Sequence, residues 1–539
     1  MFDLRDHQMS LFLNAARKGV VMQDARFGTS AYFKDAPCRM KLSDVVRLIQ
    51  GNRLGSSRNR DVTALVWDSR QVVKGSVFFA IRGSKTDGND FIPEAIQRGA
   101  IAVVSDQPHR SRPDVHYIQT RNPRIALAKC ARHFYGSADA KLHLVGVTGT
   151  NGKTTVTRLI KHLLDEDADR CGLIGTIDYI VGQRVLPSHK TTPEVDETCA
   201  LLAEMVEAGC ASAVMEVSSH GIDQNRTWGL QFDTLAFLNL SQDHLDYHGD
   251  MEQYFASKAR LFEGSVNPLP RQAVINVDDA AGRRLREQLP ESVRCISFAT
   301  EQVEADFRAT RIHAVANGTR FLLHSPEGQF DLKIPLVGHF NVSNALAAIA
   351  CAYASGLALN TILQRLSKVP SVPGRMEVIA EEGTSFLTVV DYAHTHDALE
   401  KLLLTVRALT PGRLHVVFGC GGDRDRAKRP LMMQTVCRLA DEIVATADNP
   451  RTEAQQQIFD DMRTGQDAGA SVRYILDREA AIHAAIAAAE PGDAVVIAGK
   501  GHETFQIVEN SMIPFDDRLV ARAALKELCN QTSHLLGDH

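Results

Sequence analysis

The sequence predicts an α/β protein with several parallel sheets, and three observations support this. Short apolar segments alternate with amphipathic ones along most of the chain, which is typical of strands and helices in doubly wound sheets. A strand, a glycine-rich turn and a helix start follow one another between residues 142 and 155. The length of 539 residues exceeds a single ordinary core and suggests roughly three domains.

Composition narrows the class of protein. Hydrophobic residues make up 44% and charged residues 23%, with a formal net charge of -5, so neither nucleic acid nor an anionic membrane is an expected partner. The ten cysteines form no CxxC pair, which argues against a disulfide framework or zinc site and suits a reducing compartment. No apolar run approaches the roughly 18 residues of a membrane helix. The N-terminus MFDLRDHQMS lacks the apolar stretch of a signal peptide. We therefore expect a cytoplasmic location and no membrane insertion.

Changes in pattern divide the chain into four parts. Residues 1–39 show no clear period and are expected to form an N-terminal extension, possibly disordered. A short amphipathic helix ending at a glycine opens the next region, residues 40–140. The central region covers 141–370 and ends near VPSVPGR, whose two prolines and glycine indicate a boundary. The last region covers 371–539.

Strands are expected wherever short apolar runs are bounded by turn residues. Between residues 195 and 206 the spacing of Val195, Cys199, Leu202 and Val206 predicts an amphipathic helix. The expected strands lie at 63–68, 77–81 and 102–105, then at 142–147, 212–218, 235–240 and 273–278, and finally at 387–393, 414–420, 442–448 and 494–500.

The segment VGVTGTNGKTT, residues 145–155, predicts a phosphate-binding loop. Backbone N–H groups of such a turn surround a phosphate, and the dipole of the following helix favours its charge. Lys153 would reach the β- and γ-phosphates, and the Thr154 hydroxyl would hold Mg²⁺. The common GxxxxGK[ST] pattern requires glycine at Val147, so the loop is a variant, and a purely structural glycine turn is the alternative. The candidate ATP-binding residues here are Gly149, Thr150, Asn151, Gly152, Lys153, Thr154 and Thr155.

Polar groups near two later strand ends are candidates for the same site. Glu216 ends SAVMEVSSH, where ligand sites of parallel sheets gather. His244 and His248 in DHLDYHG would be four residues apart on a helix, which fits a metal pair but also two surface histidines. Lys258 in YFASKARLF reads from the sequence alone as a solvated surface charge.

Ordered motifs from about Lys41 to the C-terminus resemble those of the Mur ligase family, specifically the members that add a diamino acid. These motifs are GTNGKTT, HKTTPE, MEVSSHGIDQNR, DHLDYHG, GHFNVSN, PGRME, DYAHTHD, GCGGDRDRAKRP, DNPR and GKGHE. The resemblance implies a domain for a UDP moiety, a central ATPase domain and a C-terminal Rossmann-like domain for the incoming amino acid. It also implies that the protein is a monomer, that ATP is a co-substrate, and that two Mg²⁺ ions are bound.

The resemblance implies roles for individual residues. Thr154, Glu216, His244 and Lys258 would bind Mg²⁺, with Lys258 as an N-carboxylated lysine, and together with Lys153 they form the catalytic set. Asn344, Arg375 and Asp391 would position the nucleotide. The UDP-linked substrate would contact Ser69, Ser84, Lys85, Thr86, Thr191, Thr192, Ser218, Gln224 and Arg226. The diamino acid would contact Arg424, Asp448, Asn449, Pro450, Arg451, Gly499 and Glu503.

The implied reaction joins meso-2,6-diaminopimelate to the D-Glu carboxylate of UDP-N-acetylmuramoyl-L-Ala-D-Glu through an acyl phosphate, as a step of peptidoglycan precursor synthesis. Arg451 would select diaminopimelate over L-lysine, because a guanidinium binds the extra carboxylate with two parallel hydrogen bonds. An ordinary surface salt bridge is the alternative role for Arg451. His396 departs from the family, which usually has proline there. Two rivals are a folylpolyglutamate synthetase-like ligase and, from a different class, a P-loop regulatory ATP-binding protein.

Overall fold

The computed structural model describes residues 40–50, 59–83, 86–109, 112–165, 170–315, 318–509 and 511–537. This part of the chain forms two compact units that divide between Pro370 and Ser371. The expected N-terminal extension, residues 1–39, and the candidate residues Ser84 and Lys85 lie outside the described residues.

The first unit opens with a four-stranded parallel sheet in the order β3-β4-β5-β6. Strands were expected at three of these places. β6 has no predicted counterpart, because Ile118 is its one buried side chain and leaves no apolar run. The elements are β1 Met40–Lys41, α2 Leu42–Gln50, β2 Asp61–Val62, β3 Ala64–Val66, η3 Ser69–Gln71, β4 Ser76–Phe79, η4 Gly88–Phe91, α3 Ile92–Gln97, β5 Ala102–Ser105, β6 His116–Gln119, α4 Pro123–Phe134 and η5 Ala138–Ala140.

The larger sheet of this unit has eleven strands, ordered β10-β9-β8-β11-β7-β12-β13-β14-β15-β16-β17. Its strands β7, β8 and β11–β15 are parallel, and the two ends of the sheet are antiparallel. The elements are β7 His143–Thr148, α5 Lys153–Leu164, β8 Cys171–Ile174, β9 Asp178–Val181, β10 Arg184–Pro187, α6 Val195–Glu207, β11 Ser212–Glu216, α7 Ser219–Asp223, β12 Thr234–Phe237, α8 Leu245–His248, α9 Met251–Ala259, β13 Gln272–Asn276, α10 Ala280–Gln288, β14 Arg294–Ala299, β15 Phe307–Val315, β16 Gly318–Ser325, β17 Gly328–Ile334, α11 His339–Ala354 and α12 Leu359–Leu366.

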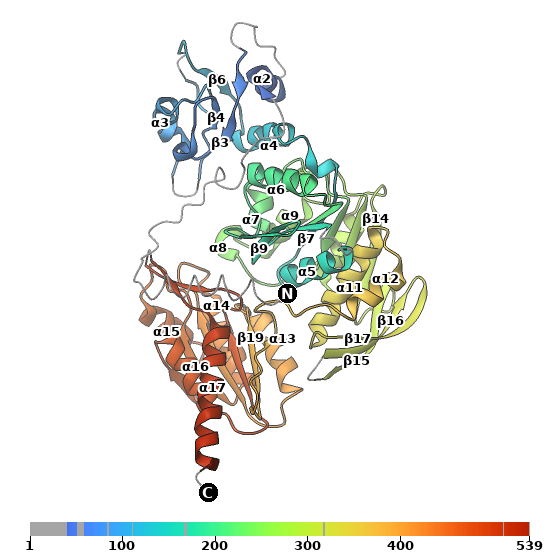
Figure 1. Cartoon of the computed structure of the whole chain (residues 1–539), viewed down its shortest axis with the longest axis vertical. Coiled ribbons are helices and arrows are strands. Elements are labelled where there is room, and N and C mark those ends of the chain that lie inside the picture. The colour runs from blue at the N-terminus through green and yellow to red at the C-terminus, as the bar shows by residue number, and fades with distance from the viewer. Residues whose placement is uncertain are drawn as a thin grey trace. The chain divides into compact units, whose positions relative to one another are not determined.

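Helices cover both faces of this sheet, which confirms the predicted doubly wound architecture (Figure 1). In β7 the side chains alternate: Leu144 packs in the core beside α6, and Val145 packs in the core beside α5, α11 and α12. The chain runs from β7 to one side of the sheet and later returns to its other side at β12. β7 therefore lies at the topological switch point, where doubly wound sheets bind their ligands.

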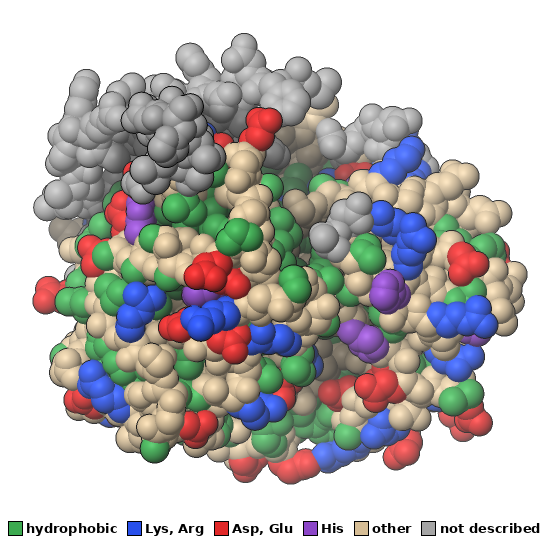
Figure 2. All heavy atoms as spheres, turned by 90° about the horizontal axis from the view of Figure 1, so that it is seen from below, with side chains coloured by type: hydrophobic (Ala, Val, Ile, Leu, Met, Phe, Trp, Pro, Cys, Tyr) green, Lys and Arg blue, Asp and Glu red, His purple; other side chains and the backbone are tan. Residues whose placement is uncertain are grey.

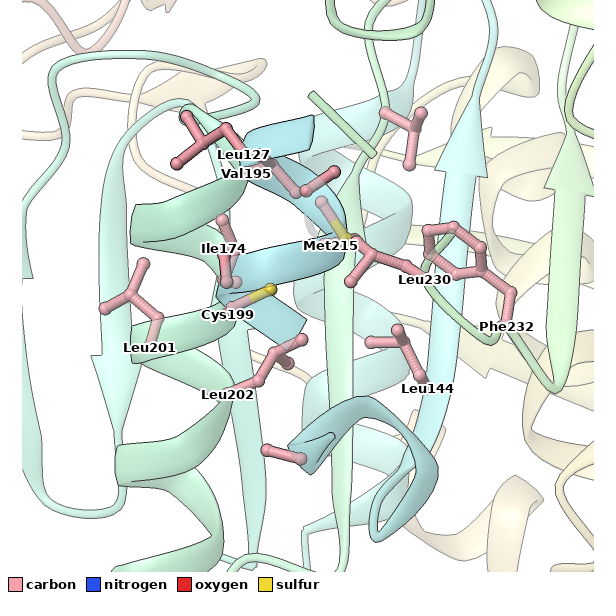
Figure 3. Close-up of a cluster of buried hydrophobic side chains, with 14 of the residues drawn as sticks. Leu127, Leu144, Ile174, Val195, Cys199, Leu201, Leu202, Met215, Leu230 and Phe232 are labelled. Atoms are coloured by element: carbon pink, nitrogen blue, oxygen red, sulfur yellow. The ribbon is translucent and has the colours of Figure 1, made fainter. Parts of the chain in front are cut away.

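The helix α6 joins the two sheets of this unit into one core. Its residues Val195, Cys199 and Leu202 are buried as predicted and lie close to Leu127 of α4 (Figure 3). The other faces of α6 are covered as well, with Leu201 among the buried residues. The helix α6 therefore lies between the sheet and α4. It does not have one apolar face and one solvent-exposed face, because α4 packs on the side turned away from the sheet.

The second unit is built on a six-stranded sheet in the order β18-β19-β23-β20-β21-β22. All pairs except β18–β19 are parallel. The four strands expected from the sequence are β19, β20, β21 and β23, with α16 and α17 packed together over one face. The elements are β18 Glu377–Val378, β19 Leu387–Asp391, α13 His396–Arg407, β20 Leu414–Cys420, α14 Lys428–Leu439, β21 Glu442–Ala447, α15 Gln455–Arg463, β22 Val472–Tyr474, α16 Arg478–Ala487, β23 Ala494–Ala498, β24 Phe505–Val508, β25 Ser511–Pro514 and α17 Asp517–Gly537.

Two further features bear on partners. In the part of the chain that the structure describes, every helix is too short or too polar to cross a bilayer. On the face drawn in Figure 2, acidic and basic side chains are interspersed without a continuous basic area.

Asp196, in the first turn of α6, is a buried carboxyl group whose Oδ1 has no hydrogen-bond partner among the described residues. Burial, together with the nearby carboxylates of Glu194 and Glu197, raises the pKa of Asp196 to about 7. Between about pH 4 and pH 7 the folded protein keeps a proton that the unfolded chain has released. The free energy of unfolding therefore falls as the pH rises through this window.

We expect Asp196→Asn to be more stable than the wild type at pH 8 by about 2–4 kcal/mol, with this difference shrinking towards pH 4. The amide resembles the protonated acid and does not ionise. Denaturant unfolding of both proteins at several pH values measures the effect. Glu287→Gln, at an exposed position of α10, is the control and should leave the pH dependence unchanged. Equal stability of Asp196→Asn and wild type at pH 8 would contradict the expectation.

Candidate functional site

The glycine-rich turn connects the carboxyl end of β7 to the first turn of α5. Gly149 has φ 153° and Gly152 has φ 89°, conformations that an L-residue rarely adopts. The ammonium of Lys153 donates hydrogen bonds to the carbonyl oxygens of Gly149 and Thr150, at 2.9 Å each. The lysine thus folds back over the turn, as the prediction of a phosphate loop requires. Val147, where the common pattern has glycine, is a buried strand residue.

The segment after β12 fixes the shape of this turn. The side chain of Asn239 accepts from the backbone N–H of Asn151 at 2.8 Å and donates to its carbonyl at 3.1 Å. The hydroxyl of Thr150 accepts from the backbone N–H of Ser241 at 3.0 Å. Sequence reasoning missed Asn239 and Ser241. The available signal was their position directly after a buried strand that neighbours β7.

Glu216 ends β11, beside β7, and joins three segments. Its Oε2 accepts from the hydroxyl of Thr154 at 3.0 Å and from that of Thr176 at 2.9 Å. Its Oε1 accepts from the backbone N–H of Thr176 at 2.8 Å. The predicted pair Thr154 and Glu216 therefore meets at the phosphate loop. Thr176 was missed, and it continues the contact to Thr191 through a hydroxyl pair at 3.0 Å.

Lys258 lies in α9 and is buried, with 1% of its surface exposed, so the solvated surface charge expected from the sequence alone is wrong. Its ammonium donates to the carbonyl of Gly149 at 3.0 Å and lies 4.6 Å from the ring centre of Tyr254. Among the described residues Lys258 forms no ion pair with a carboxylate. Burial lowers the pKa of Lys258 well below its ordinary value, and nearby Lys153 lowers it further, against the opposing effect of Asp243.

The predicted histidines lie at the two ends of the short helix α8. His244 caps α8 in a left-handed conformation, with φ 55°. Burial lowers the pKa of His244 to about 3, although neighbouring Asp243 raises it. His248 is buried and forms a hydrogen bond with the hydroxyl of Ser219 at 2.9 Å, so it is not a surface residue. The ring of His220, which was not predicted, packs edge-on against His244 with centroids 4.8 Å apart.

Four of the residues predicted for the UDP-linked substrate form one hydrogen-bonded group beyond β11. The hydroxyl of Thr192 accepts from the backbone N–H of Ser218 at 3.0 Å and pairs with its hydroxyl at 3.1 Å. The guanidinium of Arg226 donates to the carbonyl of Thr192 at 3.0 Å and to the amide oxygen of Gln224 at 2.6 Å. Thr191 joins them through Thr176.

Three cations surround Glu194 next to this group. Lys190, Arg226 and Arg124 lie 3.1, 3.1 and 3.0 Å from its carboxylate oxygens. Burial by itself raises the pKa of Glu194, but the three cations together bring it below its usual value. Three cations thus share the carboxylate of Glu194, while Asp196 and Glu197 lie close to it at the start of α6. Arg124 and Lys190 were not predicted.

The candidate residues of the four-stranded sheet lie in different settings. Ser69 is buried, and its hydroxyl donates to the carboxylate of Glu94 at 2.7 Å. Thr86 is exposed, and its carbonyl accepts from the backbone N–H of Gly83 at 2.9 Å. Their role towards a UDP group stays a prediction.

The residues predicted to position the nucleotide divide between the two units. Asn344 of α11 lies against the phosphate loop, since a Cβ atom on Gly152 would come within 2.5 Å of its Oδ1. In the second unit, Asp391 ends β19 and accepts from the backbone N–H groups of Met376 and Ala393 at 2.6 and 2.7 Å. Arg375 stacks on the ring of Tyr392, 4.4 Å from its centre.

Two arginines meet at the carboxyl edge of the sheet in the second unit. Arg451 follows β21 in a left-handed conformation, with φ 53°, and donates to the carbonyl of Gly422 at 2.7 Å. Arg424 donates to the carbonyl of Asp423 at 3.2 Å. Burial and the charge of Arg424 lower the pKa of Arg451. Neither arginine forms a salt bridge within the described ranges, so the surface salt bridge considered for Arg451 is wrong.

Acidic and amide groups from neighbouring loops lie at the same edge. Asn449 donates to Glu503 at 2.8 Å, and Asp448 lies against Gly499, where a Cβ atom would come within 2.7 Å of its Oδ2. The carbonyl of Pro450 packs against Gly422, where a Cβ atom would lie only 1.9 Å away. The structure therefore brings together all the residues predicted for the diamino acid.

A glycine-rich turn with a lysine at the switch point of one parallel α/β sheet, followed by a second parallel α/β sheet, is typical of a class of nucleotide-dependent α/β enzymes. Three family models match: the Mur ligase family catalytic domain at residues 61–135, the Mur ligase middle domain at 147–352, and the Mur ligase glutamate ligase domain at 374–501. The chain belongs to the Mur ligase family and is a ligase that consumes ATP.

Individual relatives agree with this assignment. A "UDP-N-acetylmuramoyl-L-alanyl-D-glutamate--2,6-diaminopimelate ligase" of Geobacillus thermodenitrificans is 43% identical over 493 residues, which cover 90% of this chain and 100% of that protein. A solved structure of a ligase with the same name has a TM-score of 0.64 at 35% identity, covering 91% of this chain and 99% of that one. A solved structure of a Mycobacterium tuberculosis folylpolyglutamate synthase is 20% identical, with a TM-score of 0.56. The match covers 75% of this chain and 94% of that one, and it shows a shared fold alone.

Proposed function

We propose that this ligase joins meso-2,6-diaminopimelate to the D-Glu carboxylate of UDP-N-acetylmuramoyl-L-Ala-D-Glu, with conversion of ATP to ADP and phosphate, in peptidoglycan precursor synthesis. The names of the relatives support this substrate set. The single observation that carries the proposal is the pair of arginines, Arg424 and Arg451, which lie near Asp448 and Glu503 and form no salt bridge in the part of the chain that the structure describes.

The proposed chemistry has two steps. A substrate carboxylate oxygen attacks the γ-phosphorus of ATP, which forms an acyl phosphate and releases ADP. The neutral amine of the incoming amino acid then attacks the acyl carbon, and phosphate leaves with the C–O bonding electrons while the amine loses its proton. Two anions approach each other in the first step, so a cation at the phosphate loop offsets their repulsion. Lys153 has the position for this, because it already lies across the turn.

The residues around the phosphate loop fit a site for Mg²⁺. The hydroxyl of Thr154 and the carboxylate of Glu216 point at each other across 3.0 Å and offer hard oxygen ligands. His244 and a carboxylated Lys258 would complete the set, and two ions are proposed. The oxygens of a carbamate on Lys258 would add hard anionic ligands to those of Thr154 and Glu216. Bound Mg²⁺ would neutralise charge on the phosphates and the carboxylate.

Carboxylation of Lys258 is chemically reasonable where the lysine lies. The reaction adds CO₂ to a neutral amine and releases a proton, giving a carbamate anion. Burial and the charge of Lys153 favour the neutral amine of Lys258. The backbone carbonyl of Gly149, 3.0 Å from its nitrogen, places the product beside the phosphate loop.

The second unit would bind the far end of diaminopimelate, which carries both a carboxylate and an ammonium. Arg451 and Arg424 would bind the carboxylate, and Glu503 with Asp448 the ammonium. The strained backbone of Arg451 supports a functional role, because the left-handed conformation costs free energy for a bulky residue. Asn449, Pro450 and Gly499 would shape the loop. Arg375 and Asp391 are proposed as nucleotide-positioning residues of the second unit, and Asn344 is proposed as one of the first.

The first unit would hold the UDP-linked dipeptide. The hydrogen-bonded group of Thr192, Ser218, Gln224 and Arg226, with Thr191 beside it, continues from Glu216 and so lies next to the phosphate loop. This proximity supports a dipeptide end that is bound near the γ-phosphate. Ser69, Ser84, Lys85 and Thr86 would contact the UDP end.

We further propose a monomeric cytoplasmic enzyme with three domains, 40–140, 141–370 and 371–539, and without nucleic acid or membrane as partner. A folylpolyglutamate synthetase shares the fold, but the identity to the diaminopimelate ligases is much higher. A regulatory ATP-binding protein would leave Arg451 and Glu503 without a purpose.

A coupled assay of ADP release tests the proposed function. We expect rapid release when ATP, the UDP-muramoyl dipeptide and meso-diaminopimelate are present together, and at least about 10²-fold slower release when either acceptor is omitted. L-Lysine and folate with glutamate serve as competing substrate sets. ATP turnover that needs no acceptor would favour the regulatory protein, and turnover with folate and glutamate would favour the synthetase.

A further inference from the structure

Lys500 is a fully buried lysine at the carboxyl end of β23 in the second unit, with 0% of its surface exposed. Its ammonium donates to the amide oxygen of Asn449 at 3.0 Å and to Oε2 of Glu503 at 2.8 Å. A buried cation is costly unless it is paired. Both of its partners are residues proposed to bind the diamino acid.

These contacts fix the orientation of both partners. Oδ1 of Asn449 accepts from Lys500 and from the backbone N–H of Ile507, at 2.9 Å, so the amide cannot flip without losing both bonds. The amide nitrogen of Asn449 therefore donates to Oε2 of Glu503 at 2.8 Å. Oε2 of Glu503 accepts two hydrogen bonds in all. Oε1 of the same carboxylate has no hydrogen-bond partner within the described ranges.

We propose that Lys500 is a positioning residue that pins Glu503 through Oε2, so that Oε1 is presented to the ammonium at the far end of the diamino acid. The inference rests on the proposed function. The hydrogen bonds that Asn449 and Lys500 both donate to Oε2 hold the half-buried carboxylate of Glu503 in one orientation. With Arg424 and Arg451 nearby, the site then offers separate partners to the carboxylate and the ammonium of one zwitterionic group.

The test compares meso-diaminopimelate with 2-aminopimelate, which keeps the far carboxylate but lacks the far amino group. We expect wild-type kcat/KM to favour diaminopimelate by about 100-fold. In Lys500→Met this ratio should fall at least tenfold, mainly through a higher KM for diaminopimelate. The KM values for ATP and the UDP-muramoyl dipeptide should stay within about twofold, since neither touches Lys500. Glu503→Gln should reduce the ratio similarly, and the double variant should reduce it no further.

Arg478→Met is the control for a general loosening of these loops. Arg478 is also fully buried, pairs with Asp517 at 2.7 Å and donates to the carbonyls of Ala447 and Ala498, which precede the two binding loops. Within the described residues Arg478 forms no hydrogen bond or ion pair with Glu503, although the two charges still attract each other. Its loss should lower the melting temperature and affect both amino acids equally, leaving their ratio as in the wild type.

A folded Lys500→Met variant that keeps the wild-type ratio overturns the inference, and so does an unchanged ratio in Glu503→Gln. If the methionine variant shows no cooperative unfolding, Lys500→Gln replaces it in the test. A wild-type ratio in Lys500→Gln or in Glu503→Gln then overturns the inference. Failure of the proposed function looks different. In that case the wild type itself releases no ADP with diaminopimelate, whatever residue occupies position 500.

Discussion

Lys258→Ala is expected to lower the rate of ADP formation by about 10³-fold or more, while the protein still folds and binds ATP. The alanine removes the side chain that would carry the carbamate. Among the described residues no Asp or Glu pairs with Lys258, so none is in place to supply the lost anionic oxygens. Removing the native lysine should not unfold the protein, because its one hydrogen bond is to the carbonyl of Gly149. The coupled assay measures the rate, and equilibrium binding measures the affinity for ATP.

Chemical rescue separates the carbamate from a merely structural role. Acetate or formate should restore part of the activity of Lys258→Ala, because a small carboxylate can occupy the vacated space. The same salts should not restore the activity of Lys153→Ala, because that variant has lost a cation and a carboxylate cannot replace it. Lys401→Ala, at an exposed position of α13, is the control and should be fully active. Wild-type activity in Lys258→Ala would rule out the carbamate.

Arg451→Ala should lower kcat/KM for meso-diaminopimelate by about 10³–10⁴-fold and should barely change the slow reaction with L-lysine. The arginine lies beside Arg424 and forms no salt bridge within the described ranges, so its charge is available for the carboxylate that lysine lacks. Arg451→Lys should recover little of the lost kcat/KM for meso-diaminopimelate, since an ammonium cannot make the two parallel hydrogen bonds of a guanidinium. Steady-state kinetics with both amino acids measures the preference.

Arg438→Ala is the matched control for this prediction. Arg438 lies in the same unit, is exposed and pairs with Glu400 at 2.7 Å. Its loss should leave the preference for diaminopimelate intact, because exposed ion pairs contribute little. An Arg451→Ala variant that still prefers diaminopimelate over lysine by the wild-type factor would show that selection lies elsewhere.

Much of the fold followed from local patterns. Continuous apolar runs made six buried strands predictable, namely β7, β11, β12, β20, β21 and β23. Their observed ends differ from the predicted ends by a few residues. The strands β15–β17 were not predicted. Their burial alternates, with many exposed positions, and polar edge strands of this kind carry no apolar run.

Local motifs identified most of the candidate site as well, but not its supporting contacts. Thr154 and Glu216, predicted from separate motifs, meet through a hydrogen bond that spans 62 positions of the chain. Asn239 and Lys500 act through bonds across 88 and 51 positions. The position of Asn239 after a buried strand was a signal for that residue, but no residue near Lys500 in the sequence indicates its bond to Asn449.

By itself the sequence determined the alternation of strands and helices, the phosphate loop and the motifs that mark the Mur ligase family, because each depends on residues close together in the chain. Tertiary structure alone decided that Lys258 is buried beside Gly149, that Arg451 pairs with no carboxylate of the described residues, and that Lys500 bonds to Asn449. Burial and charge pairing depend on which distant segments pack against a residue, and that packing is settled only when the sheets assemble.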